Sequence, residues 1–306
     1  MQYQPLSDAV AVRLVAAGLQ LDVVRRVIAA GLDEDLSNGP DITTMATVPA
    51  EQRSRAALAV RRNGCVAGLD VAAAAFEMVC GASAIMIEFN KHDGDRVAAG
   101  VVLATIEAPT RGLLTAERTA LNLLGRLSGI ASATAKWADA IADTGASVRD
   151  TRKTTPGLRQ LEKYAVRCGG GINHRMSLSD AALVKDNHIV AAGGVAEAFS
   201  AVRKLRGDIA IEIEVDTLDQ LRVALSAGAD LVLLDNMAPE LLRQAVQISS
   251  EHLAKSGKQV LLEASGGLSL ENARAVAQSG VHYISVGALT HSAPVLDIGL
   301  DMQEVI

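Results

Sequence analysis

Aromatic residues are scarce in this chain: Phe, Tyr and Trp make up 2% of its 306 residues. The core must therefore be built from Ala, Val, Leu and Ile, which favours close packing of helices on sheets. Few aromatic rings also argue against the stacking platforms that bind single-stranded nucleic acid. Basic residues are outnumbered too, 29 against 35 acidic ones, so the net charge is −6. Because a negative net charge does not attract a polyanion, we expect no nucleic-acid partner.

Cysteines and long apolar runs are also few. The three cysteines, Cys65, Cys80 and Cys168, lie far apart without the spacing of a metal site, so we interpret them as reduced thiols. No apolar run reaches the roughly 18–20 residues of a membrane span. The first residues lack the charged and apolar pattern of a signal peptide. We expect a cytoplasmic protein without a membrane partner.

The first part of the chain mixes helical and strand-like patterns. Apolar residues between Leu6 and Ala30 predict two short helices, broken at Gly18 and ended by Gly31, before a polar loop over 33–44. Further along, the pattern predicts strands at Arg55–Val60, Ile85–Phe89 and Val101–Ile106 and helices at Val71–Val79 and Thr115–Ile141.

The stretch "HDGDRVAAGVVLATIEAP" at 92–109 predicts a hairpin of a small β-sandwich. It superficially resembles biotinyl and lipoyl carrier domains, but it lacks the lysine that such domains carry at a hairpin tip. A carrier or binding module is the non-enzyme alternative, and a modified lysine in the protein's mass would reveal it.

The second half of the chain alternates regularly between apolar runs and helical segments. Helices are predicted at Thr217–Ser226, Pro239–Ser250 and Ser269–Ser279, and strands at Ser147–Asp150, Ala181–Lys185, Ala210–Val215, Leu231–Asp235, Val260–Ala264 and His282–Val286. Such alternation indicates parallel strands, in a barrel or in an open sheet. Almost every run ends in a polar residue, and no glycine-rich fingerprint follows the first strand. A barrel, in which all the strand ends meet at one mouth, is therefore favoured.

Cationic residues follow several of these runs. Arg and Lys at strand ends predict a ligand with more than one anionic group, because guanidinium and ammonium groups pair with carboxylate and phosphate. The set is Arg152, Lys153, His174, Arg175 and Lys185, with Arg118 upstream.

Acidic residues and glycines complete the predicted mouth. Glu214 and Asp235 end neighbouring strands, where two carboxylates can bind Mg²⁺, although they could instead neutralise the basic residues. Ser265, Gly266, Gly267 and Gly287 follow the last two strands, where many barrels bind a phosphate through backbone N–H groups. Cys168 has no base beside it in sequence and is interpreted as a packing thiol.

These residues lie within long stretches that resemble quinolinate phosphoribosyltransferases essentially from end to end. The matching stretches include "DTRKTTPGLRQLEKYAV" at 150–166, "GGGINHR" at 169–175, "LVKDNHI" at 183–189, "LEASGGL" at 262–268 and "YISVGALTHS" at 283–292. The resemblance implies an N-terminal α/β sandwich domain plus an incomplete (β/α) barrel of the type II phosphoribosyltransferase kind. The implied domains are 1–114 and 115–289, with 290–306 returning to the first.

The resemblance also implies an activity and its site. The reaction converts quinolinate and phosphoribosyl pyrophosphate into nicotinate mononucleotide, pyrophosphate and CO₂, with Mg²⁺, in a homodimer. Arg118 would reach the partner subunit's site, and Arg152, His174, Arg175 and Lys185 would hold the carboxylates of quinolinate. Lys153, Glu214 and Asp235 would address phosphoribosyl pyrophosphate and Mg²⁺, with the two carboxylates as metal ligands. Ser265, Gly266, Gly267 and Gly287 would bind the 5-phosphate.

Two enzyme alternatives remain open at this point. The paralogous protein of molybdenum-transport operons shares some of these motifs, but the intact "EKYAV" and "KDNHI" favour the quinolinate enzyme. Phosphoribosylation of nicotinate without decarboxylation is the other alternative, and CO₂ release separates the two reactions.

Overall fold

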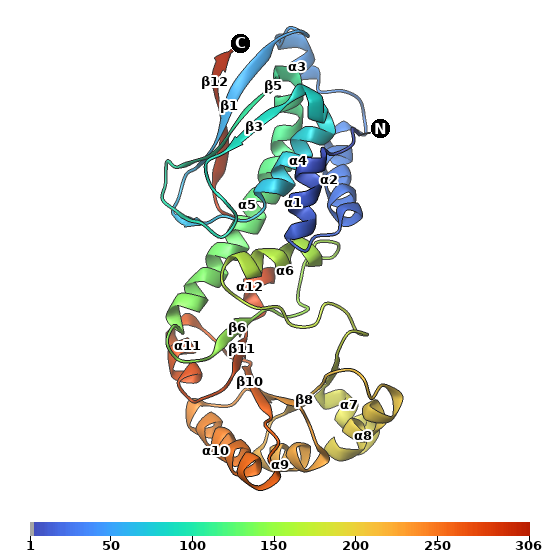
Figure 1. Cartoon of the computed structure of the whole chain (residues 1–306), viewed down its shortest axis with the longest axis vertical. Helices are drawn as coiled ribbons and strands as arrows, with labels where there is room; N and C mark the ends of the chain where they lie inside the picture. The colour runs from blue at the N-terminus through green and yellow to red at the C-terminus, as the bar shows by residue number, and fades with distance from the viewer. Residues whose placement is uncertain (1–2) are drawn as a thin grey trace. The chain divides into compact units, whose positions relative to one another are not determined.

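A computed structural model describes residues 3–306, which divide into two compact units (Figure 1). The first unit comprises Met1–Ala135, Thr154–Gly170 and Thr290–Ile306, and the second comprises Lys136–Lys153 and Gly171–Leu289. Each unit has its own sheet and its own apolar core. Within residues 3–306, none of the helices combines the length and the apolar character that crossing a membrane requires.

The first unit is built on a four-stranded antiparallel sheet. Its strands are β1 (Arg53–Val60), β3 (Met86–Phe89), β5 (Val102–Pro109) and β12 (Ile298–Val305), in the order β12-β1-β5-β3. A separate two-stranded ladder joins β2 (Gly64–Cys65) to β4 (Arg96–Val97). The last strand of the chain, β12, therefore forms one edge of this sheet and pairs with the first strand, β1.

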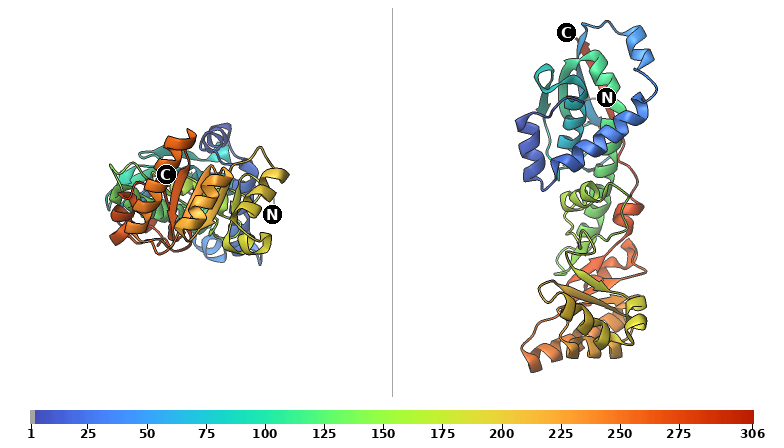
Figure 2. Two further views of the ribbon diagram at one scale, coloured as in Figure 1. Left: turned by 90° about the horizontal axis from the view of Figure 1, so that it is seen from below. Right: turned by 90° about the vertical axis from the view of Figure 1, so that its right-hand side faces the viewer.

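The first unit also contains helices. They are α1 (Asp8–Ala16), α2 (Leu21–Leu36), α3 (Ile42–Thr47), α4 (Leu69–Cys80), the 3-10 helix η1 (Ala82–Ala84), α6 (Arg159–Cys168) and α5 (Thr110–Ala140), whose last residues belong to the second unit. Figures 1 and 2 show α1, α2 and α4 together on one side of the sheet. The four alanines 72–75 of α4 are buried, and Phe76 beside them is fully buried. Small side chains let these helices approach closely, as the scarcity of aromatics predicts.

The predicted end of the second helix at Gly31 is wrong. α2 continues through Gly31 to Leu36, and α3 forms at Ile42–Thr47 within the predicted polar loop. A Cβ atom at position 31 would lie 3.0 Å from Cγ2 of Thr119 on α5. Glycine therefore serves close helix packing here and does not end the helix, a role that only the tertiary structure reveals.

The predicted hairpin at 92–109 is also wrong. β4 and β5, which lie in this stretch, do not pair with each other: β4 pairs with β2, and β5 pairs with β1 and β3. The strand predicted at Val101–Ile106 is present as β5, but its partners lie outside this stretch.

The second unit contains a six-stranded sheet that is parallel throughout. Its strands are β6 (Ser147–Arg149), β7 (Ala182–Val184), β8 (Ile211–Val215), β9 (Leu231–Asp235), β10 (Leu261–Ser265) and β11 (Tyr283–Ser285). The connecting helices are α7 (Asp186–Ala192), α8 (Val195–Leu205), α9 (Leu218–Ala227), α10 (Pro239–Ser256) and α11 (Leu270–Ala277), and the short α12 (Ala288–His291) follows. Each predicted strand is present to within one or two residues.

The strand order is that of an incomplete barrel. It runs β6-β11-β10-β9-β8-β7, so each strand lies beside its neighbour in the chain except for β6, which lies beside β11. Helices α8 to α11 lie along one face of the sheet (Figures 1 and 2), as they do outside a barrel, whereas an open doubly wound sheet carries helices on both faces. The predicted fold class is confirmed.

We expect Gly129→Ala to destabilise the first unit. A Cβ atom on Gly129 of α5 would lie 2.1 Å from the backbone oxygen of Pro294, just before β12. Overpacking of this kind costs roughly 1–3 kcal/mol, more than the helix propensity that alanine adds. Urea unfolding measures the loss. The control is Gly207→Ala, whose Cβ would make only an ordinary contact at 3.5 Å. Equal stability of the two variants would contradict the close contact.

Candidate active site

The parallel register brings the ends of the strands together at one edge of the second unit. Asp235 at the end of β9 pairs with Ser265 at the end of β10, Ser265 pairs with Ser285, and Ser285 pairs with Arg149. In a parallel sheet the carboxyl ends of all the strands lie at the same edge. The predicted residues that follow these strands are therefore neighbours in space, although they span more than a hundred residues of sequence.

Lys185, Glu214 and Asp235 form one electrostatic group at this edge. Nζ of Lys185 lies 2.6 Å from Oε2 of Glu214. Burial and then the negative charge of Glu214 raise the pKa of Asp235 above its ordinary value. Oδ2 of Asp235 accepts a hydrogen bond of 2.6 Å from Nδ2 of Asn236. Two neighbouring carboxylates, only one of which is paired with a lysine, can bind a cation or the hydroxyl groups of a ligand.

The loop after residue 172 positions His174 and Arg175. The buried carboxylate of Asp150, at the end of β6, accepts the backbone N–H of His174 at 2.8 Å and Nδ2 of Asn173 at 2.6 Å. Nη1 of Arg175 donates to the oxygen of Ala181 at 2.9 Å. Asp150 therefore acts as an anchor that brings this loop back to the strand ends.

Arg152 and Arg175 lie close enough for their positive charges to interact. Burial, followed by the positive charge of Arg152, lowers the pKa of the Arg175 guanidinium. Nε of Arg175 is buried and makes no hydrogen bond to any residue in the described part of the chain. Two half-buried guanidinium groups repel each other, and a carboxylate or phosphate between them relieves that repulsion.

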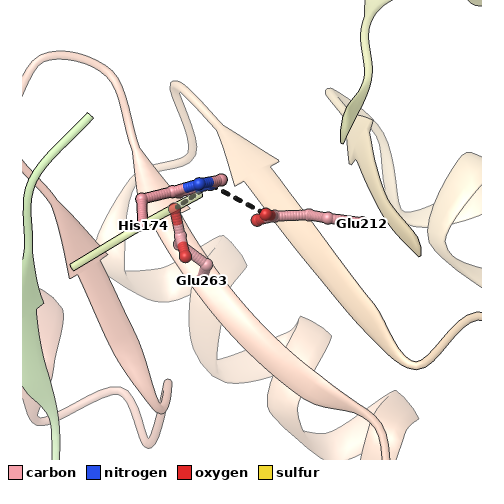
Figure 3. A group of neighbouring side chains, drawn as sticks. All are labelled: His174, Glu212 and Glu263. Carbon is pink, nitrogen blue, oxygen red and sulfur yellow. Dashed lines mark ion pairs between the residues drawn. The ribbon is translucent and has the colours of Figure 1, made fainter. Parts of the chain in front are cut away.

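His174, Glu212 and Glu263 form a buried group of ionisable residues in the second unit (Figure 3). Nε2 of His174 lies 2.9 Å from Oε2 of Glu212 on β8 and 3.8 Å from Oε1 of Glu263 on β10. Glu263 is also paired with Arg149 and accepts the hydroxyl of Ser285. Burial raises the pKa of Glu212 to about 7, although the positive charges nearby act in the opposite direction. Burial and the charge of Glu212 likewise raise the pKa of Glu263.

His174, Glu212 and Glu263 offer three ligand atoms within 4.8 Å of one another, so they could in principle hold a metal ion. The guanidinium of Arg149 already neutralises Glu263, however, and a cation beside it would be repelled. Glu214 and Asp235 offer oxygen ligands at the strand ends, which suit Mg²⁺ better.

The glycines after β10 allow a tight turn. Gly266 and Gly267 have φ angles of +81° and +60°, and Asn236 beside them has φ +54°. A Cβ atom on Gly266 would lie 2.2 Å from Oδ1 of Asn236, whose N–H donates to the oxygen of Ser265 at 2.8 Å. Only glycine fits at position 266, and the exposed backbone can approach an anion closely. Gly287 follows the neighbouring strand β11.

The remaining predicted cations are exposed. Lys153 follows β6 in the second unit, and its backbone N–H donates to Oγ1 of Thr151 at 3.0 Å. Arg118 lies on α5 in the first unit, where it lines a cavity of about 490 Å³ with Arg62 and Asn122. The second unit thus contains every predicted site residue except Arg118.

Arg149, Glu263 and Ser285 also lie at the site, although they were not predicted. For two of them a signal was present: a charged residue stands inside the otherwise apolar "VLLEA" at 260–264, and another precedes Asp150 in "SVRD". Alternation along a strand places Glu263 on the same face as Ser265, and hence at the site. A buried charge in a strand interior indicates a partner, but the sequence does not say which.

Cys168, which ends α6 in the first unit, is not activated. Burial and then the negative charge of Asp93 raise the pKa of its thiol to about 12. A raised pKa leaves the thiol protonated at neutral pH, and the protonated form is a poor nucleophile.

We expect Cys168 in the folded protein to resist iodoacetamide at pH 8. With a pKa of about 12, roughly one thiol in ten thousand is ionised at that pH, so alkylation proceeds at least about a hundredfold more slowly than in the unfolded chain. Mass spectrometry of the peptide that contains Cys168 follows the reaction, with the same protein in urea as the control. Similar rates in both conditions would refute a buried, protonated thiol.

Comparisons with known proteins agree over most of the chain. A family model described as the quinolinate phosphoribosyl transferase C-terminal domain matches residues 130–301, and the corresponding N-terminal domain matches residues 41–128. The chain is 49% identical over 283 residues to a Mycobacterium leprae protein named nicotinate-nucleotide pyrophosphorylase (carboxylating), which covers 92% of this chain and 98% of the relative.

A plant protein and a solved structure extend the similarity. The mitochondrial quinolinate phosphoribosyltransferase (decarboxylating) 2 of Nicotiana glauca is 37% identical over 289 residues, which are 90% of this chain and 81% of the relative. The structure of the nicotinate-nucleotide pyrophosphorylase from Francisella tularensis superposes with a TM-score of 0.86 at 38% identity and covers 93% of this chain and 98% of that one.

Proposed function

Because this chain belongs to the quinolinate phosphoribosyltransferase family, we propose that it transfers the phosphoribosyl group of phosphoribosyl pyrophosphate to quinolinate, with decarboxylation, in NAD biosynthesis. The products are nicotinate mononucleotide, pyrophosphate and CO₂. One observation carries the proposal for this chain: a pair of guanidinium groups and a pair of carboxylates meet at a single sheet edge.

Quinolinate is a dianion, and the cationic side of the edge suits it. We assign its carboxylates to Arg152, His174, Arg175 and Lys185. The buried Nε of Arg175 supports this assignment, since it lacks an acceptor within the described residues and a substrate carboxylate would supply one. Lys185, which contacts Glu214, connects the quinolinate side to the ribose side of the site.

Phosphoribosyl pyrophosphate suits the other side of the edge. Its 5-phosphate is assigned to the backbone of Ser265, Gly266, Gly267 and Gly287, because that turn leaves no room for a side chain at position 266. Its ribose and pyrophosphate are assigned to Lys153, Glu214 and Asp235.

The residues present fit Mg²⁺. Glu214 and Asp235 are half-buried oxygen donors at the ends of neighbouring strands, and burial, followed by the negative charge of Glu214, raises the pKa of Asp235. They would hold the ion directly or through water, and protein Mg²⁺ sites commonly combine one or two carboxylates with substrate phosphates. When bound, Mg²⁺ neutralises the charge of the pyrophosphate as it departs.

Catalysis follows from positioning and electrostatics. The carboxylates of Glu214 and Asp235 stabilise positive charge that develops on the ribose as its bond to pyrophosphate lengthens. The pyridine nitrogen of quinolinate attacks that carbon while the arginines hold the ring in place. The carboxylate next to the nitrogen then leaves as CO₂, and the ring carbon takes a proton. No covalent nucleophile is required, which agrees with the protonated thiol of Cys168.

We further propose that the enzyme works as a homodimer in which Arg118 serves the site of the partner subunit. Arg118 is exposed on α5 and belongs to the first unit, whereas the other assigned residues belong to the second. We also propose that the protein is cytoplasmic. The free thiols of its three cysteines support this location, because the cytoplasm keeps thiols reduced.

We expect the purified protein to convert quinolinate and phosphoribosyl pyrophosphate into nicotinate mononucleotide with one CO₂ released per product. Chelation of divalent cations should stop turnover, and added Mg²⁺ should restore it. Chromatography of the nucleotide and trapping of ¹⁴CO₂ from labelled quinolinate measure the two products. Lack of product at millimolar substrates would defeat the proposal, and product from nicotinate without CO₂ would favour the alternative reaction.

We expect Arg118→Ala and Lys153→Ala each to lower kcat/KM by roughly a hundredfold or more, because each removes a charge that faces the substrates. If sites are shared across a two-fold dimer, half of the randomly mixed dimers carry one intact site, so mixing the two variants restores about a quarter of wild-type activity. Mass spectrometry of intact dimers confirms exchange of subunits. Exchange without recovery would refute sharing, and the double variant mixed with itself is the control.

A further inference from the structure

The cavity of about 490 Å³ in the first unit is lined by two arginines, Arg62 and Arg118. Neither makes a hydrogen bond or an ion pair with any residue from 3 to 306. The preceding arginine in the chain is paired, because Nη2 of Arg61 lies 2.5 Å from Oδ1 of Asp301. Two guanidinium groups that share a cavity and have no acidic partner there can bind an anion from outside the chain.

Three segments of the first unit build this cavity, and backbone contacts hold them together. One face of α5 contributes residues at the helical spacing i, i+3, i+4 and i+7, which are Arg118, Leu121, Asn122 and Gly125. The segment 295–298, which leads into β12, packs on that face, since the N–H of Leu296 donates to the oxygen of Gly125 at 2.9 Å. Arg62 follows β1, and the N–H of Arg61 beside it donates to the oxygen of Asp297 at 2.8 Å. The cavity therefore does not depend on the arginine side chains that line it.

Acidic residues nearby do not neutralise both arginines. Asp297 also lines the cavity, but it forms no ion pair within residues 3–306, and its negative charge acts on Arg61. Glu117 is near enough for the charge of Arg118 to lower its pKa, although burial, the larger effect, raises that pKa. Two guanidinium groups and one carboxylate give the lining a net charge of +1. The exposed amide of Asn122 adds a neutral hydrogen-bond donor.

Apolar side chains in the lining indicate which kind of anion fits. Leu121, Leu296 and Ile298 are buried and line the cavity beside the arginines. Pyrophosphate is polar over its whole surface and would lose hydration against such a wall without compensation. A carboxylate on a flat ring can place the ring against the apolar wall and its charge toward the guanidinium groups, which also stack on aromatic rings. Of the two substrates of the proposed reaction, quinolinate is of this kind.

We propose that Arg62 is a further substrate-binding residue, which binds a carboxylate of quinolinate together with Arg118. This inference rests on the proposed function, in which Arg118 serves the site of the partner subunit. It adds a second guanidinium group from the same cavity to that site. Each first unit then contributes a pair of arginines, and not a single one, to the binding of the aromatic substrate.

The test compares Arg62→Ala with Arg62→Lys. Arg62 is exposed, so both variants should melt at the wild-type temperature. We expect Arg62→Ala to raise KM and the calorimetric Kd for quinolinate at least about fivefold, because it removes a charged hydrogen bond at a partly screened position. KM for phosphoribosyl pyrophosphate should stay within about twofold of wild type. Arg62→Lys should recover part of the affinity, since lysine keeps the charge but not the two parallel donors of a guanidinium.

A matched control is available on α2 of the same unit. Arg26 is likewise exposed and forms no hydrogen bond or ion pair within the described residues 3–306, but it does not line the cavity. Arg26→Ala removes the same charge and should leave KM for both substrates unchanged. If Arg62→Ala binds quinolinate as Arg26→Ala does, or if its KM for phosphoribosyl pyrophosphate rises as much as that for quinolinate, the proposal is overturned.

A double-mutant cycle with Arg118 tests whether the two arginines bind the same ligand. If they do, the loss of kcat/KM for quinolinate in Arg62→Ala/Arg118→Ala should be smaller than the product of the two single losses by about twofold or more. A double variant whose loss equals that product would show independent arginines and would contradict joint binding. Absence of quinolinate turnover in wild type would count against the proposed function instead, so the two failures are distinguishable.

Discussion

Six parallel strands in register are the constraint on which the site depends. Antiparallel pairing would distribute the ends of alternate strands between opposite edges of the sheet. Parallel pairing sets Asp235, Ser265, Ser285 and Arg149 side by side. The connecting helices on one face let the chain return to the same edge each time, so each loop can contribute a side chain. A ligand with several charged groups can then be met from several loops at once.

Much of this arrangement could be predicted from the sequence because buried parallel strands read as apolar runs that end in polar residues. Lys185, Glu214 and Asp235 are of this kind, and their strands lie where the pattern indicates. The two wrong predictions share another cause. Gly31 is a close-packing residue against Thr119, and β4 pairs with β2 in place of β5. Both depend on contacts between segments that local patterns do not relate.

The contacts of Arg149 with the buried residues Glu263 and Ser285 could not be predicted from local sequence patterns either. Glu263 looks in the sequence like an isolated charge within an apolar strand, and its meaning comes from Arg149, more than a hundred residues away. Ser285 completes the same contact from a third strand. A buried carboxylate is costly unless it is paired and hydrogen-bonded, so the existence of partners could be expected. Their identities could not, because they follow from the strand order.

The arrangement of charges explains how an acidic chain can bind dianions. Overall charge acts weakly at a distance, since salt screens exposed charges beyond about 8–10 Å. Within the site, burial reduces that screening, so the charges nearest to a ligand determine whether it binds. Burial, followed by the positive charge of Arg152, lowers the pKa of Arg175, so the two guanidinium groups repel each other near the edge. The carboxylates of Asp150, Glu212 and Glu263 are buried, and that of Asp150 holds this loop in place through the N–H of His174 and the amide of Asn173. The carboxylate of Asp150 that anchors the loop is thus buried, and the part of the edge that carries Arg152 and Arg175 stays positive for an anionic ligand.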